Sequence, residues 1–303
     1  MVLIENVNKS YKDVKALIDI NLKINQGELF GLIGPDGAGK TTLFRLMTTL
    51  LLPSNGSISI LDYDTKIDYQ KIREIVGYMP GKFSLYKDLT VKENIEIFAS
   101  LFNTKMDENI DIVKGIYNQL APFENRYAED LSGGMKQKLA LCCALIHKPK
   151  ILFLDEPTTG VDPMSRKEFW EILANLKREG ITIIVSTPYM DEASKCDRIA
   201  LIQNGKILTV NTPDIIESEY PAELFKVSAK NMFQLLQYLK KHPQAASCFP
   251  FGDSHHFELS KKASEKGFHT ENLINELNNI GFEEVKVEKI NAKIEDCFMY
   301  LSR

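Results

Sequence analysis

The sequence predicts an α/β protein built on a mostly parallel sheet, followed by a smaller α+β domain. Apolar runs of strand length alternate with amphipathic helical patterns as far as residue 210, which is typical of a parallel sheet covered on both faces. A glycine-rich loop at residues 34–42 joins one such run to a helix. The stretch 212–221 is polar and carries two prolines, and the order of elements changes after it, which indicates a linker between two domains.

Composition narrows the class of protein. The chain has 303 residues, of which 44% are hydrophobic, enough to bury a full core. A net charge of −4 argues against a nucleic-acid partner, because such surfaces carry a basic excess. Five cysteines, two of them adjacent (Cys142 and Cys143), lack the spacing of a disulfide framework, so we expect buried, reduced thiols in a cytoplasmic protein.

No segment predicts secretion or membrane insertion. Glu5 comes too early for a signal peptide, and no apolar stretch is long enough for a membrane span. A partner would therefore have to supply any contact with a membrane.

The N-terminal part predicts antiparallel strands. Residues 1–5 and 17–24 alternate apolar and polar side chains, with residues 10–13 as the turn between them. Tyr11 lies in this turn, where an amphipathic ring could cover a strand edge or take part in binding. Residues 29–33 are apolar and predict a buried strand that leads into the loop. The following helix starts near Thr41 and extends to about residue 51, before Pro53.

The loop fits G-x-x-x-x-G-K-[ST] in the strand-loop-helix context that a phosphate-binding loop requires. Glycines allow successive backbone N–H groups to curl around phosphates, and the helix N-terminus faces the anion with its positive dipole end. Lys40 would reach the β- and γ-phosphates, and Thr41 would hold Mg²⁺. The expected binding residues here are Gly34, Asp36, Gly37, Ala38, Gly39, Lys40, Thr41 and Thr42.

The middle of the chain predicts a strand at 75–79, a capped helix from Thr90 and a mostly helical stretch to about residue 127. Ser132, Gly133 and Gly134 then precede a helix that runs from residue 135 to about 146. Taken alone, this sequence is either a plain helix cap or a second anion site.

Two carboxylates follow a buried strand. Residues 151–154 are entirely apolar and predict a central parallel strand, which ends at Asp155 and Glu156. Adjacent carboxylates at this position are costly unless a cation or a reaction uses them. Asp155 suits a contact with Mg²⁺, and Glu156 suits a base for water.

Alternating elements continue to residue 210. Residues 159–163 lead into an amphipathic helix that contains Trp170, to which we assign no function, and that ends at Gly180. A buried strand at 181–185, a helix from Asp191 and a hairpin about residues 204–205 follow.

The C-terminal part predicts strands at 224–229, 245–260 (two strands) and 282–290, with helices at 231–241 and 270–280. The order βαββαβ indicates a ferredoxin-like sandwich. His255 and His256 have no companion ligands, so we interpret them as an exposed strand pair and not as a metal site.

The ordered motifs resemble the ATP-binding subunits of ATP-binding cassette (ABC) transporters over residues 2 to about 217. They are the phosphate loop, Leu-Ser-Gly-Gly-Met-Lys-Gln, Leu-Asp-Glu-Pro and Gly-Val-Asp-Pro, and the Ser-Gly-Gly signature separates this family from other P-loop proteins. Residues 77–80, 85–94 and 294–298 are similar to bacterial drug and polysaccharide exporters. The resemblance implies a P-loop NTPase cassette at 1–217 with a helical subdomain at about 85–147. An accessory or dimerisation domain would follow at 222–303.

This resemblance implies an ATPase that uses Mg²⁺ and works as a pair of cassettes arranged head to tail. Each ATP would lie between the Lys40 loop of one subunit and the signature of the other, formed by Ser132, Gly133, Gly134 and Gln137. Tyr11 would stack on adenine, and Thr41 and Asp155 would hold the metal. Glu156 would polarise the attacking water, and Asp162 would couple the two sites. The expected partners are membrane-spanning subunits, which would hold the chain at the inner face of the cell membrane.

Three positions depart from the family pattern. Gly81 replaces a glutamine that touches Mg²⁺ and water, Pro188 replaces a histidine that contacts the γ-phosphate, and Asp36 replaces an asparagine. Neither Gly81 nor Pro188 can supply the missing contact. We therefore expect slow hydrolysis and a heterodimer with a competent cassette, and a homodimer is the second arrangement that fits the sequence. Two competing functions are a regulatory nucleotide sensor and a soluble cassette that acts on ribosomes or DNA.

Overall fold

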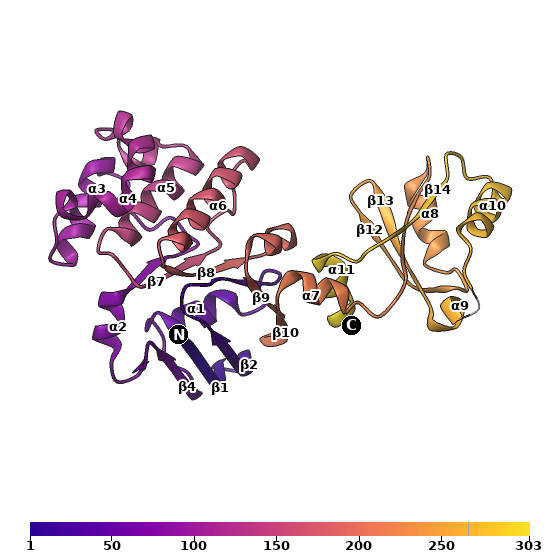
Figure 1. Ribbon diagram of the computed structural model, residues 1–303, viewed down its shortest axis with the longest axis horizontal. Coiled ribbons are helices and arrows are strands. Elements are labelled where there is room, and N and C mark those ends of the chain that lie inside the picture. The colour runs from indigo at the N-terminus through magenta and orange to yellow at the C-terminus, as the bar shows by residue number, and fades with distance from the viewer. Residues whose placement is uncertain (266) are drawn as a thin grey trace. The chain divides into compact units, whose positions relative to one another are not determined.

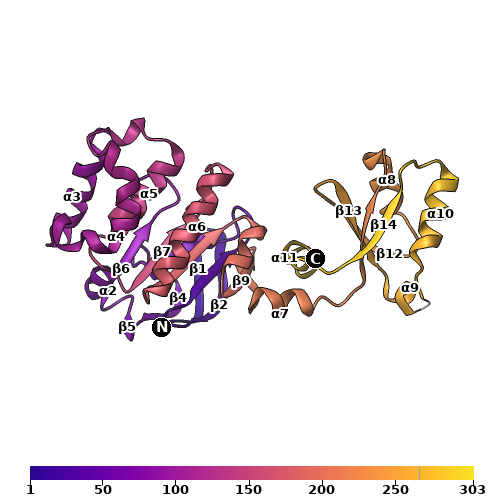
Figure 2. The same ribbon diagram turned by 45° about the horizontal axis from the view of Figure 1, so that its top comes forward.

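The computed structural model describes residues 1–265 and 267–303. The chain divides into two compact units, Met1–Pro213 with Ser302 and Asp214–Leu301 with Arg303. Figures 1 and 2 show the elements of each unit.

The first unit contains a six-stranded sheet in the order β10-β9-β3-β8-β7-β6. All neighbouring strands in it are parallel except the pair β9 and β10, which forms the predicted hairpin. Strands β3, β7 and β8 are buried at every position, as predicted for strands covered on both faces. The strands are β3 (Leu29–Ile33), β6 (Val76–Met79), β7 (Ile151–Asp155), β8 (Thr182–Thr187), β9 (Arg198–Gln203) and β10 (Lys206–Asn211).

An antiparallel sheet in the order β2-β1-β4-β5 accompanies the parallel one. Apolar side chains from both sheets and from helix α1 form one core, in which the rings of Phe44 and Phe153 meet edge to face with centroids 5.8 Å apart. These strands are β1 (Val2–Tyr11), β2 (Val14–Ile24), β4 (Asn55–Ile60) and β5 (Tyr63–Asp64).

Helices α3, α4 and α5 pack on one another to form the predicted helical part (Figure 1). Thr90 and Glu93 form the predicted capping box at the start of α3. The helices of this unit are α1 (Lys40–Met47), α2 (Tyr69–Ile75), α3 (Val91–Leu101), α4 (Met106–Leu120), α5 (Gly133–Leu145) and α6 (Pro163–Arg178). Short 3₁₀ helices are η1 (Ala121–Phe123), η2 (Ala128–Asp130) and η3 (Met190–Lys195).

The second unit is built on an antiparallel sheet in the order β12-β13-β11-β14, which has its own apolar core. Its elements are α7 (Pro213–Ser218), β11 (Leu224–Ser228), α8 (Met232–Leu239), β12 (Ala245–Phe251), β13 (Ser254–Leu259), α9 (Lys261–Glu265), α10 (Thr270–Ile280), β14 (Lys286–Ile290) and α11 (Ile294–Leu301). In the described parts of both units, no helix combines the length and apolarity needed to cross a membrane.

Several local predictions were wrong. Strand β1 extends through Tyr11, which pairs with Val14, so the turn holds only residues 12–13. Residues 213–218 of the predicted linker form helix α7. Helix α1 already ends at Met47, the segment from Asp191 is a 3₁₀ helix, and the last strand is confined to residues 286–290. Helices α2 and α9 were not predicted.

The histidine pair of β13 is buried and not exposed as predicted. The exposed fractions of His255 and His256 are 4% and 6%, because β13 is an inner strand that is buried at every position. A ring nitrogen of His255 lies 2.7 Å from the carbonyl oxygen of Met232, and His256 pairs with Asp296 at 2.6 Å. The described residues contain no cluster of three potential metal ligands, so we assign the pair to packing.

We predict that the thiols react only when the protein unfolds. All five cysteines are buried, as predicted, and burial raises the pKa of Cys248 and Cys297 to about 12 from an ordinary value of 9.0. Hardly any thiolate is then present in the folded protein at pH 8. The thiols of the unfolded chain lose their protons at a lower pH than those of the folded protein. The contribution of these two thiols to the free energy of unfolding is therefore fully present below pH 9 and is lost as the pH rises toward 12.

Iodoacetamide labelling at pH 8 over a urea series, read by mass spectrometry, checks this prediction. Labelling should follow the unfolding curve measured by circular dichroism. Rapid labelling of any cysteine without urea would contradict it.

Candidate functional site

The glycine-rich loop turns directly from the buried strand β3 into helix α1. Gly37 and Gly39 have φ angles of 78° and 107°, in the left-handed region that glycine adopts without strain. A β-carbon on Gly39 would also lie 2.8 Å from the carbonyl oxygen of Ala16, so a larger residue would have to push the neighbouring strand away. These contacts explain why the loop needs its glycines.

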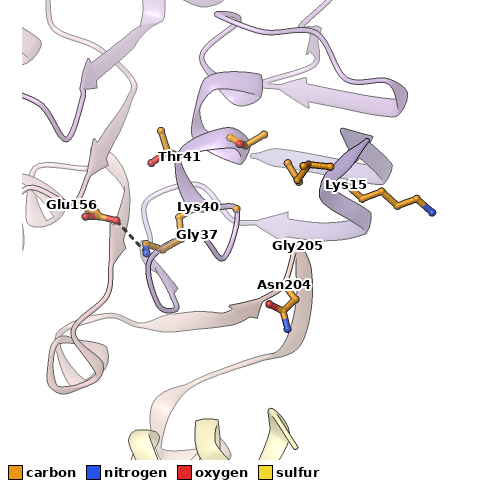
Figure 3. A pocket seen from close by; sticks show the side chains of 11 residues that line it. Lys15, Gly37, Lys40, Thr41, Glu156, Asn204 and Gly205 are labelled. Carbon is orange, nitrogen blue, oxygen red and sulfur yellow. Dashed lines mark ion pairs between the residues drawn. The ribbon is translucent and has the colours of Figure 1, made fainter. Parts of the chain in front are cut away.

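Lys40 is held inside this loop (Figure 3). Its side chain is 3% exposed, and Nζ donates hydrogen bonds to the carbonyl oxygens of Gly34 at 2.7 Å and Pro35 at 3.0 Å. Nζ also forms an ion pair with Glu156 Oε1 at 3.1 Å. An ammonium group has three donors, so these three protein groups can satisfy it fully. A phosphate that binds Lys40 must therefore compete with Glu156.

A pocket of about 410 Å³ lies beside the loop. It brings together part of the predicted set with residues from β2 and from the β9–β10 turn (Figure 3). Its lining consists of Val14, Lys15, Ala16, Gly37, Gly39, Lys40, Thr41, Thr42, Glu156, Asn204 and Gly205.

Five of these lining residues, 14–16 and 204–205, were missed as site residues. Their position follows from tertiary contacts: Gly205 N donates to Ala38 O at 3.0 Å, and Ile18 N donates to Gly205 O at 2.8 Å. The turn of the hairpin is therefore fastened to both the loop and β2. The sequence predicted the turn, but nothing in it indicated where the turn would dock.

Two predicted binding residues lie at the margin of the pocket. Tyr11 is 42% exposed and is not part of the pocket lining, although its strand partner Val14 is. Lys9 Nζ lies 5.5 Å from the centre of the Tyr11 ring. Asp36 is exposed and also lies outside the lining.

Asp155 and Glu156 meet Ser186 at the carboxyl ends of β7 and β8. Asp155 is 2% exposed and pairs in register with Ser186, whose hydroxyl donates to Asp155 Oδ1 at 2.6 Å. Glu156 has a φ angle of 51°, which is uncommon outside glycine, and its carboxylate reaches Lys40. Burial raises the pKa of Tyr78 to about 12, and the negative charge of Asp155 adds to this effect.

Of the three departures from the family pattern, Gly81 lies close to these carboxylates and Pro188 follows the strand that carries Ser186. A β-carbon on Gly81 would come within 2.9 Å of the carbonyl oxygen of Asp155, so a side chain there requires the backbone to shift. Pro188 directly follows β8. The segment after it is anchored by buried Glu192, which accepts hydrogen bonds from Thr158, Thr187 and Trp170. Trp170, to which we assigned no function, thus helps to satisfy a buried carboxylate.

The second predicted motif forms the N-terminus of helix α5. Ser132 caps this helix by accepting a hydrogen bond from Met135 N at 3.4 Å, and Gln137 lies on the same helix. Gly134 packs so closely on α6 that a β-carbon would lie 2.6 Å from Ser165 Oγ. None of these residues lines the described loop pocket. Within one chain, the two candidate anion sites stay separate.

Asp162 caps helix α6 and is not part of the loop pocket either. Its Oδ1 accepts a hydrogen bond from Ser165 N at 2.9 Å, and this bond lowers the pKa of the Asp162 carboxyl below its usual value. Asp162 thus stabilises the first turn of α6, which is the turn that packs on Gly134.

The residues present fit a magnesium-bound nucleotide. A β-carbon on Gly37 would meet no atom within 4 Å, so the loop leaves room for an anion beside Lys40. Thr41 lines the pocket with its hydroxyl, whereas the carboxylate of Asp155 is buried behind the described lining. Mg²⁺ prefers such oxygen ligands and usually completes its shell with phosphate oxygens and water, so few protein ligands suffice.

Together, the strand-loop-helix geometry, the buried lysine and the neighbouring carboxylates define a P-loop nucleotide-binding protein. The profile of the ABC transporter family matches residues 17–159. The Nod factor export ATP-binding protein I of Burkholderia thailandensis is 35% identical over 240 residues, which cover 78% of this chain and 79% of that protein. The chain belongs to the ABC transporter family, as an ATP-binding cassette.

Further comparisons agree with this family. The probable multidrug ABC transporter ATP-binding protein YbhF of Escherichia coli is 40% identical over 71% of this chain, and the match spans 38% of YbhF. The structure of cbiO1 from Clostridium perfringens, part of the ABC transporter complex cbiONQ, aligns over 72% of this chain and 90% of its own, with a TM-score of 0.64 and 30% identity. A dimeric cassette in a post-hydrolysis state with ADP and phosphate aligns over 70% of this chain and 98% of its own, with a TM-score of 0.64 and 28% identity.

We predict that Glu156→Gln strengthens ADP binding about threefold to tenfold in the absence of Mg²⁺. The substitution removes a negative charge that competes with phosphate for Lys40, and a partly buried ion pair of this kind is worth about 1 kcal/mol. Isothermal titration calorimetry in EDTA measures the effect without any contribution from hydrolysis.

Glu168→Gln is the matched control, because Glu168 pairs with Lys138 at 2.7 Å and neither residue lines the described pocket. Its ADP affinity should equal that of the wild type. An unchanged or weaker affinity of Glu156→Gln would contradict the competition between Glu156 and phosphate.

Proposed function

We propose that this chain is the ATP-binding subunit of an export complex and that it couples ATP binding and hydrolysis to transport through separate membrane-spanning subunits. The observation that carries the proposal is the loop itself, with buried Lys40 between the carbonyl groups of the loop and Glu156. Family membership supports ATP as the nucleotide. The names of several relatives refer to export of Nod factors or to resistance to drugs, which supports export over import.

The residues divide into roles that the geometry supports. Lys40 and the loop N–H groups would hold the phosphates, and Thr41 and Asp155 would hold Mg²⁺. Glu156 would act as the base that polarises water, since it lies at the pocket and would be freed from Lys40 when phosphate binds. Tyr11 would stack on adenine, which would lie beyond the edge of the pocket formed by Val14.

A second cassette would complete the site. The described loop pocket of the same chain is not lined by Ser132, Gly133, Gly134 or Gln137, which supports binding of these residues to an ATP held by a partner. Asp162 would connect the two sites, because it caps α6 where that helix packs on Gly134. The partner is proposed to be a different, competent cassette, because Gly81 and Pro188 supply no γ-phosphate contacts.

The C-terminal unit is proposed to be a ferredoxin-like accessory domain, with the cassette at 1–217 and the accessory domain at 222–303. Its strand order β14-β11-β13-β12 and its antiparallel pairs support this topology. The chain would lie on the cytoplasmic face of the membrane, held there by its partner subunits.

We predict slow ATP hydrolysis by the purified chain and about a tenfold increase in kcat for Pro188→His. An imidazole at this position can restore a contact with the γ-phosphate, and one such contact is worth about a hundredfold in favourable cases. Gly81→Gln should increase kcat less than Pro188→His does, because the β-carbon that it adds would clash with the carbonyl oxygen of Asp155. Steady-state phosphate release measures both variants.

Glu156→Gln in the Pro188→His background is the control and should abolish the gain. A fast wild-type rate that Glu156→Gln abolishes would contradict a degenerate site. ATP binding without turnover in any variant would favour a regulatory nucleotide sensor.

We predict that the Glu156→Gln variant remains monomeric with MgATP at a protein concentration of about 10 µM, because its competent partner is absent. Analytical ultracentrifugation with and without MgATP tests this. An ATP-dependent dimer of this chain alone would establish a homodimer and exclude the need for a different partner.

A further inference from the structure

We infer that Ser186 is a positioning residue for the magnesium ion. Its hydroxyl fixes the carboxylate of Asp155 and the backbone of Glu156 in one arrangement and so sets the affinity of the nucleotide complex for the metal. The inference rests on the proposed function, because it concerns the metal-nucleotide site. It assigns a role to a residue that touches neither nucleotide nor reacting atoms.

Ser186 binds both carboxylate residues, through its hydroxyl and its backbone carbonyl group. Its Oγ donates to Asp155 Oδ1 at 2.6 Å, and the backbone N–H of Glu156 donates to both Ser186 Oγ and Ser186 O at 3.0 Å. A hydroxyl has one donor and two acceptor lone pairs, so donation to Asp155 and acceptance from Glu156 are compatible. Ser186 is fully buried, and bulk water does not compete for these bonds.

The consequence for Asp155 is a fixed carboxylate. Asp155 is 2% exposed, and a buried carboxylate is costly unless its oxygens have partners. With Oδ1 bound to Ser186, rotation of the carboxylate about its χ2 angle is restricted. Groups that orient a metal ligand in this way typically contribute about tenfold to a hundredfold to metal affinity.

The consequence for Glu156 is a maintained backbone conformation. A φ angle of 51° costs about 1 kcal/mol for a residue with a side chain, and it persists where surrounding bonds impose it. The two acceptors of Ser186 hold the N–H of Glu156 in this conformation, from which its carboxylate reaches Lys40 at 3.1 Å. The metal ligand and the base are therefore positioned by the same side chain.

Strand β8 contains a second buried hydroxyl that serves as a control. Residues 183–185 of β8, which precede Ser186, are apolar and buried. Thr182, at the other end of β8, is likewise buried, and its hydroxyl accepts a hydrogen bond from Gly27 N at 2.9 Å. It thus offers a matched control: a buried hydroxyl on the same strand, far from the carboxylates.

The experiment compares metal affinity with metal-free nucleotide affinity in the full chain. ADP binding is measured by calorimetry in EDTA, and Mn²⁺ binding to the ADP complex is measured by electron paramagnetic resonance, so no turnover is needed. For Ser186→Ala we expect an ADP Kd within about twofold of the wild type and Mn²⁺ affinity about tenfold lower. Ser186→Thr keeps the hydroxyl and should keep the wild-type Mn²⁺ affinity. Thr182→Val should leave the ADP Kd and the Mn²⁺ affinity unchanged.

Unchanged Mn²⁺ affinity in Ser186→Ala would overturn the inference, as would an equal loss in Thr182→Val. If Ser186→Ala fails to fold by circular dichroism, Ser186→Cys keeps the volume and offers only a weak donor, and the same loss is expected. Absence of ADP binding by the wild-type chain would overturn the proposed function and this inference with it. ADP binding with unaltered metal affinity in Ser186→Ala overturns this inference alone.

Discussion

The structure of the site depends on the convergence of opposite charges at the carboxyl ends of three buried parallel strands. Lys40 follows β3, Asp155 and Glu156 end β7, and Ser186 lies near the end of β8. A buried charge is costly by several kcal/mol if unpaired. The ion pair with partly buried Glu156 offsets that cost for Lys40, and the hydrogen bond from Ser186 helps to offset it for Asp155. The same contacts hold Lys40 Nζ beside the place where a phosphate would bind. A site arranged in this way is stable before a nucleotide binds, because Glu156 stands in for the missing negative charge.

Close backbone approach is the second condition of the site. The loop, strand β2 and the β9–β10 turn come together at Gly39 and Gly205, where added β-carbons would lie 2.8 Å and 2.6 Å from the same carbonyl oxygen, that of Ala16. Three segments that are distant in sequence can share this space only if the residues at the contact have no side chain. The antiparallel sheet is therefore part of the site, since it supplies Val14, Lys15 and Ala16 to the pocket.

Sequence reasoning predicted the parts of the site that depend on local chemistry. The loop at residues 34–42, the carboxylates at the end of β7 and the helix caps at Thr90 and Ser132 require particular residue types at fixed spacings, and the structure contains these local features. It did not predict the docking of Asn204 and Gly205 or the hydrogen bonds of Ser186, because both depend on which strands become neighbours. The burial of His255 and His256 was missed for a similar reason. An alternating pattern indicates one buried face, whereas successive positions of β13 are all buried.

The separation of the two anion-binding helix ends has a consequence for how the chain can act. Helix α1 begins at the loop pocket, while helix α5 begins at Ser132, and α5 is fixed to α6 by the contact of Gly134 with Ser165. This close contact holds the start of α5 against α6, which supports the proposal that Ser132 serves a nucleotide on another molecule. Asp162 lies at the same contact and caps α6. Any displacement of Ser132 by a partner's nucleotide would therefore be transmitted to α6, whose Trp170 supports Glu192 and the segment that carries Pro188. On the proposed assignment, a missing γ-phosphate contact at Pro188 would leave this chain connected to its partner, because the path from Ser132 to that segment runs through α6 and does not involve the side chain of Pro188.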